Sequence, residues 1–153
     1  MYETIKYPYN TNAALTRMVV PLIFLIITAN NFKTAYLAGI TVSWVIIGIA
    51  DLIFIAQMVF IFINRLLPAL QNKAALELNE TGIDDYIRKV EISWKDVAAI
   101  NLEQGRRTKM VIDLKEETDY GKQIAINLNW IQGNDLEICQ TTQAYLEEMN
   151  RLN

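Results

Sequence analysis

Few residues of this 153-residue chain have the chemistry of a catalytic or metal site. Histidine is absent, which removes the commonest general base and the commonest metal ligand. Cys139 is the single cysteine, so one chain can form neither an internal disulfide nor a multi-cysteine zinc site. Because Cys139 lies on the apolar stripe of an expected helix, we predict a small buried side chain there.

Pairs of adjacent carboxylates are the remaining candidates for acid–base chemistry: Asp84-Asp85, Glu116-Glu117 and Glu147-Glu148. Neighbouring side chains on a strand or helix point in different directions, so we expect these pairs on solvated surface. The sequence has no phosphate loop, glycine fingerprint, nucleophile elbow or metal-ligand spacing. We therefore expect a protein that is not an enzyme and that has no catalytic residues, metal or cofactor.

The one basic cluster consists of Arg106, Arg107 and Lys109, at a predicted hairpin tip. If this turn lies beside an anionic leaflet, its positive charges can contact lipid headgroups or a partner. The simpler alternative is a solvated turn without a binding role. From Arg65 onward the chain has 11 Lys and Arg against 15 Asp and Glu, a net charge of −4. This acidic balance argues against nucleic-acid binding.

Two apolar segments precede Pro68 in the sequence, at residues 13–32 and 35–67. Residues 35–67 contain only two charged residues, Asp51 and Arg65. As a helix, residues 35–63 would be about 43 Å long, more than the roughly 30 Å of a bilayer's hydrocarbon. Residues 13–32 reach a spanning length if Arg17 snorkels to the interface. A signal peptide is the competing interpretation, opposed by the lack of a small-x-small cleavage site.

These segments predict a transmembrane hairpin with spans at about 13–32 and 36–67, joined by a turn over the polar residues 30–34. Residues 1–67 then form a short tail and the hairpin, and residues 68–153 a soluble domain. Lys6 and Arg17 precede the first span, Arg65 and Lys73 follow the second, and Lys33 lies between them. The positive-inside rule therefore places both termini in the cytoplasm.

Asp51 is an ionisable residue within an apolar span, which is by default a functional candidate. If the hairpin turns near Lys33, residue 51 lies level with residues 16 and 17. This geometry predicts an intramembrane ion pair between Asp51 and Arg17. An ion or proton pathway is the alternative, and it would require several chains to assemble.

Residues 68–153 alternate between apolar and polar positions, as strands do. We expect strands at 75–79, 83–88, 90–94, 100–104, 108–115 and 122–130. Pro68 is expected to end the preceding helix, and Gly82 to supply a positive φ in the first turn. Asn134 can cap a final amphipathic helix that covers the sheet.

Residues 91–100, EISWKDVAAI, resemble the I-x-W-x-D-I-x-x-I segment of bacterial pleckstrin-homology-like (PH-like) domains, with Val97 in place of the usual isoleucine. The stretch ALELNETGIDDY resembles the opening of the same domains. The whole chain is similar to a family of small bacterial membrane proteins of unknown function, with two transmembrane helices followed by such a domain. This resemblance implies an α+β membrane protein of the bacterial inner membrane, with a small antiparallel β-barrel closed by a C-terminal helix.

Within this motif we expect structural roles, with Trp94 as an apolar body at a strand end and Asp96 accepting from backbone donors. Two classes of function remain. The first is a membrane-anchored, non-catalytic interaction module that recruits a protein partner or the lipid surface, for example by strand addition. The alternative is a membrane immunity or envelope-stress protein that acts through its hairpin. The expected partners are the lipid bilayer and either another protein or a second copy.

Overall fold

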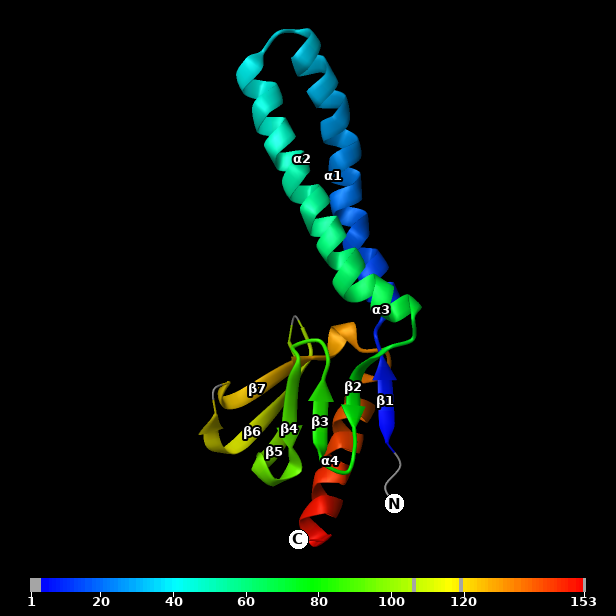
Figure 1. The fold of residues 1–153 in the computed structure, drawn as a ribbon, viewed down its shortest axis with the longest axis vertical. Coiled ribbons are helices and arrows are strands. Elements are labelled where there is room, and N and C mark those ends of the chain that lie inside the picture. The colour runs from blue at the N-terminus through cyan, green and yellow to red at the C-terminus, as the bar shows by residue number, and fades with distance from the viewer. Residues whose placement is uncertain (1–3, 106, 119, 153) are drawn as a thin grey trace. The chain divides into compact units, whose positions relative to one another are not determined.

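The computed structural model describes residues 4–105, 107–118 and 120–152. The chain has an α+β fold that divides into two units (Figure 1). One unit is the helical hairpin, residues 11–71, and the other joins residues 4–10 to residues 72–152. The division therefore differs from the predicted one, because the N-terminal segment belongs with the sheets and not with the hairpin.

The hairpin consists of α1 (Thr11–Leu37) and α2 (Thr41–Ile61). Both helices are long and apolar enough to cross a membrane. The turn predicted at residues 30–34 is wrong, since this segment is helical and the chain reverses at residues 38–40. No glycine or proline interrupts α1 there, whereas Gly39 has the positive φ of 70° that a reversal requires.

The second helix does not stop at Pro68 as predicted. A π-helical turn, Phe62–Leu66, connects α2 directly to α3 (Leu67–Leu70). Pro68 lies at the second residue of α3, directly after the π-helical turn, and its fixed φ is compatible with the helical backbone there. The helical run ends three residues after Leu67, just before Asn72 with its positive φ of 51°.

The sheet unit contains two antiparallel sheets. The first has the order β1-β2-β3-β4, and the second has the order β5-β6-β7. Their bounds are β1 Ile5–Pro8, β2 Ala74–Leu78, β3 Gly82–Asp85, β4 Val90–Ser93, β5 Val97–Glu103, β6 Lys109–Thr118 and β7 Gly121–Asn127. The predicted strands are present, and β1 is an additional one. Within the described residues no closed barrel is found, because β4 passes into β5 through a 3-10 turn, Trp94–Asp96, without pairing to it.

The helical hairpin is an insertion between two paired strands. β1 and β2 are antiparallel neighbours, with Pro8 opposite Ala74. The backbone N–H of Tyr9 donates to the carbonyl of Lys73 at 3.4 Å. The chain thus leaves and re-enters the sheet unit at adjacent positions.

The core of the sheet unit is formed by both sheets and by α4 (Asp135–Leu152). The predicted cap is confirmed: the side-chain oxygen of Asn134 accepts from the backbone N–H of Leu136 at 2.9 Å. The amide of Gln143 donates to the carbonyl of Ile100 on β5 at 2.7 Å, which fixes the helix on the second sheet. Buried side chains of α4 include Ile138, Cys139 and Leu146.

Candidate functional site

Two residues of the predicted basic cluster line a hollow in the surface at the turn between β5 and β6. Arg107 and Lys109 line this open hollow of about 540 Å³ together with Glu103. Arg106, the third predicted residue, lies outside the described residues. Lys109 and Glu103 face each other across the β5–β6 ladder, so a carboxylate shares the hollow with the two cations.

Further exposed cations lie in the turn between β3 and β4, at Arg88 and Lys89. The N–H of Tyr86 donates to the carbonyl of Ala75 at 3.1 Å, which places this turn beside the start of β2. The Arg88 guanidinium donates to the carbonyl of Ala125 on β7 at 2.8 Å. Neither Arg88 nor Lys89 was predicted as a site residue, because their position beside β7 depends on contacts between distant residues and not on a local pattern.

The two basic turns share one end of the sheet unit. The N–H of Leu128 donates to the carbonyl of Thr108 at 3.2 Å, so the β5–β6 turn lies beside the segment after β7. In that segment the Trp130 carbonyl accepts from the N–H of Asn10 at 2.8 Å. Asn10 lies two residues after the end of β1 and directly before α1, where the chain leaves for the hairpin. We call the cations at this end the basic rim: Lys73, Arg88, Lys89, Arg107 and Lys109.

A row of carboxylates crosses one face of the first sheet. Glu77, Asp84 and Glu91 are direct cross-strand neighbours on β2, β3 and β4. Burial, followed by the charges of Glu91 and Glu77, raises the pKa of Asp84, while a hydrogen bond from Asn79 opposes this shift. Lys6 on β1 lies 3.4 Å from Glu77 and neutralises the end of the row.

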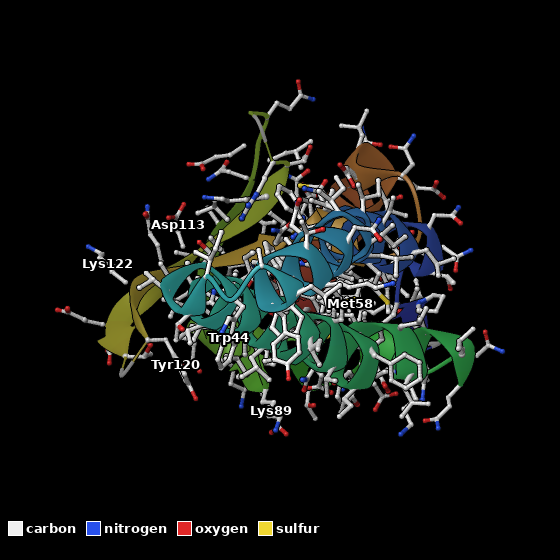
Figure 2. All side chains as sticks on the ribbon, turned by 90° about the horizontal axis from the view of Figure 1, so that it is seen from above. Trp44, Met58, Lys89, Asp113, Tyr120 and Lys122 are labelled. Atoms are coloured by element: carbon white, nitrogen blue, oxygen red, sulfur yellow. The ribbon has the colours of Figure 1, made fainter. Side chains whose placement is uncertain are left out.

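Two hollows of about 320 and 130 Å³ lie along β4 and share Glu91, Ile92 and Asp96 in their linings. Leu114 and Ile124 contribute to the smaller one. It extends to Tyr120 at the outer end of the β6–β7 hairpin, where Figure 2 shows Tyr120 and Lys122 projecting from the ribbon. Among the described residues, no group of carboxylates or cysteines is arranged to hold a metal ion.

Trp94 and Asp96 of the resemblance motif have different surroundings. Trp94 is 3% exposed, its indole N–H donates to the Asn79 carbonyl at 2.8 Å, and its ring stacks on Tyr145 of α4 at 6.0 Å. Asp96 is exposed and lines both hollows along β4. Within the described chain its carboxylate accepts no backbone hydrogen bond, and the Ser93 hydroxyl accepts from the N–H of Lys95 instead.

Asp51 contacts a different residue from the predicted one. Its carboxylate accepts a hydrogen bond from the hydroxyl of Thr28. Thr28 lies eleven residues beyond Arg17 on α1, about 16 Å along the helix axis. The prediction that placed Asp51 level with Arg17 is therefore wrong, since it assumed a turn near Lys33, and the reversal at Gly39 brings residue 51 level with residues 27 and 28.

Aromatic rings gather at the turn end of the hairpin. Trp44 on α2 meets Phe32 and Tyr36 of α1 edge to face, with ring centroids 6.3 and 6.2 Å apart. Toward the other end of the hairpin, Arg17 lies in the first turns of α1, and Arg65 lies in the π-helical turn that continues α2. Each arm of the hairpin therefore has an aromatic end and a basic end, separated by apolar residues.

The single cysteine, Cys139, is buried. Cys139 is 2% exposed, and burial raises the pKa of its thiol. A raised pKa leaves less thiolate at neutral pH, so this side chain acts as part of the core.

Comparison with known proteins gives no relative of this chain: no protein family model, no curated protein and no solved structure matches it.

Proposed function

We propose that this protein is a membrane-anchored, non-catalytic interaction module. The hairpin crosses the bacterial inner membrane, and both termini lie in the cytoplasm. One observation carries this proposal: the aromatic ends and the arginines of the two helices are separated by about the thickness of a bilayer's hydrocarbon. Tyr36 and Arg17 are 19 residues apart on α1, and Trp44 and Arg65 are 21 apart, or about 30 Å on each helix. Aromatic and basic side chains are the usual residues at the two membrane interfaces.

The insertion of the hairpin between β1 and β2 also supports anchoring. Helix α1 begins directly after Asn10, and three residues separate α3 from β2. Two such short connections restrict how far the sheet unit can move from the membrane. The domain is thus a module that works at the membrane surface.

The order of the strands supports a PH-like identity for the sheet unit. Two antiparallel sheets followed by one amphipathic helix agree with part of the layout that the resemblance implies, whereas β1 precedes the hairpin and the sheets form no closed barrel in the described residues. The buried Trp94 of the shared motif holds β4 against α4 through Tyr145. Such a domain binds partners through its surface rather than through a catalytic centre.

The basic rim is the surface that we assign to anionic lipid headgroups. It lies at the end of the sheet unit from which the chain leaves for the hairpin, although the chain from Arg65 onward is acidic overall. Basic side chains near an anionic leaflet contribute about 1 kcal/mol each to attraction, and this contribution falls with salt. We assign the row of carboxylates and the hollows along β4 to binding of a protein partner.

Cysteine labelling of the full chain in a Cys139→Ala background tests the anchoring. A membrane-impermeant maleimide should label Ile40→Cys, in the turn of the hairpin, in intact cells. It should label Lys89→Cys only after lysis. Labelling of Lys89→Cys in intact cells, or release of the chain by alkaline carbonate, would contradict the proposal.

The headgroup contact is tested with the full chain in nanodiscs. Hydrogen exchange in residues 86–89 and 107–109 should be slower in discs containing phosphatidylglycerol than in phosphatidylcholine discs. The double variant Arg107→Gln with Lys109→Gln should lose this difference, whereas Lys115→Gln with Lys122→Gln, which removes two cations from the other end of β6–β7, should keep it. Equal exchange in both lipids would rule the contact out.

A further inference from the structure

Several polar side chains of the hairpin are satisfied within it. Thr28 pairs with Asp51. Three others donate to the carbonyl oxygen four residues earlier in their own helix, at 3.0 to 3.2 Å: Asn31, Thr34 and Asn64. Side chains satisfied in this way can face lipid at little further cost.

Gln57 on α2 differs from them. Its side chain is exposed, and its amide makes no hydrogen bond to any residue that the structure describes. The side chains one turn before and one turn after it, Ile53 and Phe60, are each 62% exposed. Gln57 is therefore an exposed polar group beside outward-facing apolar side chains.

The position of Gln57 along the helix puts it within the hydrocarbon, if the hairpin spans the membrane as proposed above. It lies 13 residues from Trp44 and 8 from Arg65, or about 20 and 12 Å from the two interfaces. Both distances exceed the reach of a glutamine side chain, so its amide cannot reach the headgroups. An amide without a partner in an apolar medium costs a few kcal/mol.

We propose that Gln57 is the centre of an interface between two copies of this chain in the membrane. A carboxamide has both N–H donors and a carbonyl acceptor, so two glutamines facing each other across a two-fold axis satisfy one another. Lipid tails offer neither group, and amide pairs of this kind drive association of helices in bilayers. Ile53, Gln57 and Phe60 lie on one side of α2 and form the contact.

This inference rests on the proposed membrane anchoring, and one set of membranes tests both. The full chain carries Cys139→Ala and one new cysteine, either Ile53→Cys beside Gln57 or Ile55→Cys as the control. Ile55 is also exposed, at 48%, and lies at a similar depth about 160° around the helix. Mild oxidation should give a disulfide-linked dimer with Ile53→Cys and little with Ile55→Cys.

Adding Gln57→Leu should lower the cross-linked fraction at least about fivefold, the change expected from losing an interhelical amide pair. Gln57→Asn should preserve it, and so should Asn64→Leu, which removes an amide already satisfied by Phe60. Equal cross-linking at both positions, no dimer, or a dimer insensitive to Gln57→Leu would overturn the proposal. A cross-link to a different protein would also overturn it, in favour of a heterologous membrane partner. Alkaline extraction of the same membranes separates the two failures, since a chain that stays in the membrane without a dimer refutes only the interface.

Discussion

The hydroxyl of Thr28 on α1 donates to the carboxylate of Asp51 on α2, in the middle of two apolar helices. The Thr28 oxygen also lies 2.8 Å from the carbonyl oxygen of Phe24, which fixes its side chain. Near this pair, Phe24 and Phe54 stack with ring centroids 5.1 Å apart. The most polar contact of the hairpin thus sets the register of the two helices.

A double-mutant cycle measures this contact. Thr28→Val and Asp51→Ala, alone and together, are compared by unfolding the full chain in mixed detergent micelles. We expect a coupling free energy of about 0.5–2 kcal/mol, the range for interhelical hydrogen bonds in membranes. The cycle Thr34→Val with Asp51→Ala is the control, because Thr34 donates within its own helix. Additive effects at Thr28 and Asp51 would show that the contact does not stabilise the hairpin.

Replacing Gly82 by alanine should destabilise the first sheet. A Cβ at this position would lie 2.0 Å from the carbonyl oxygen of Ile92, so the β3–β4 backbones would have to separate. Overpacking of this kind typically costs about 1–3 kcal/mol. Hydrogen exchange of β2–β4 in the full chain measures the loss. Gly105→Ala is the matched control, since a Cβ there meets no atom of the described residues within 4 Å.

The expected role of Gly82 changes with this finding. The sequence predicted a positive φ there, but its φ is not positive, unlike those of Gly39, Gly121 and Gly133. Close approach of two strands requires the glycine, and an unchanged exchange rate in Gly82→Ala would contradict this explanation.

Trp94 should be a large single contributor to the stability of the sheet unit. Its truncation in Trp94→Ala should cost about 3–5 kcal/mol, from the lost burial and the cavity left behind. Trp94→Phe keeps most of the packing against Tyr145 but leaves the Asn79 carbonyl without the indole donor, at a cost of about 1–3 kcal/mol. Thermal unfolding followed by near-UV circular dichroism ranks the two variants, and equal losses would assign the effect to the indole hydrogen bond and contradict the expected packing contribution.

Asp84 should make the sheet unit more stable in mild acid. Because the pKa of Asp84 is higher in the folded protein than in an unfolded chain, the folded state binds more protons between these two values. The resulting stabilisation is present below the unfolded pKa and is lost as the pH rises through the folded pKa. Asp84→Asn should flatten this part of the stability profile and raise stability at neutral pH.

Unfolding of the full chain between pH 4 and pH 7 checks the sign. Glu91→Gln removes the larger of the two neighbouring charges that raise the Asp84 pKa and should shift the profile to lower pH. A profile that rises with pH through this interval in the parent, and not in Asp84→Asn, would reverse the assignment.

Local patterns were enough to place most elements. Two long apolar stretches gave two helices, since segments so apolar on every side form helices and not sheet edges. Alternation gave the strands from β2 to β7, and Asn134 gave the start of α4. These features depend on residues close in sequence, and nearby residues decide them physically through periodicity and capping.

Contacts between distant residues were decided by the folded chain. The polar segment Ile5–Pro8 becomes a strand only because β2, far along the sequence, offers it a free edge. The partner of Asp51 depends on the residue at which the hairpin turns, and a shift of that turn from Lys33 to Gly39 replaced Arg17 by Thr28. The basic rim likewise forms because strand pairing brings the turn of Arg88 and the turn of Arg107 to one end, which no local pattern encodes.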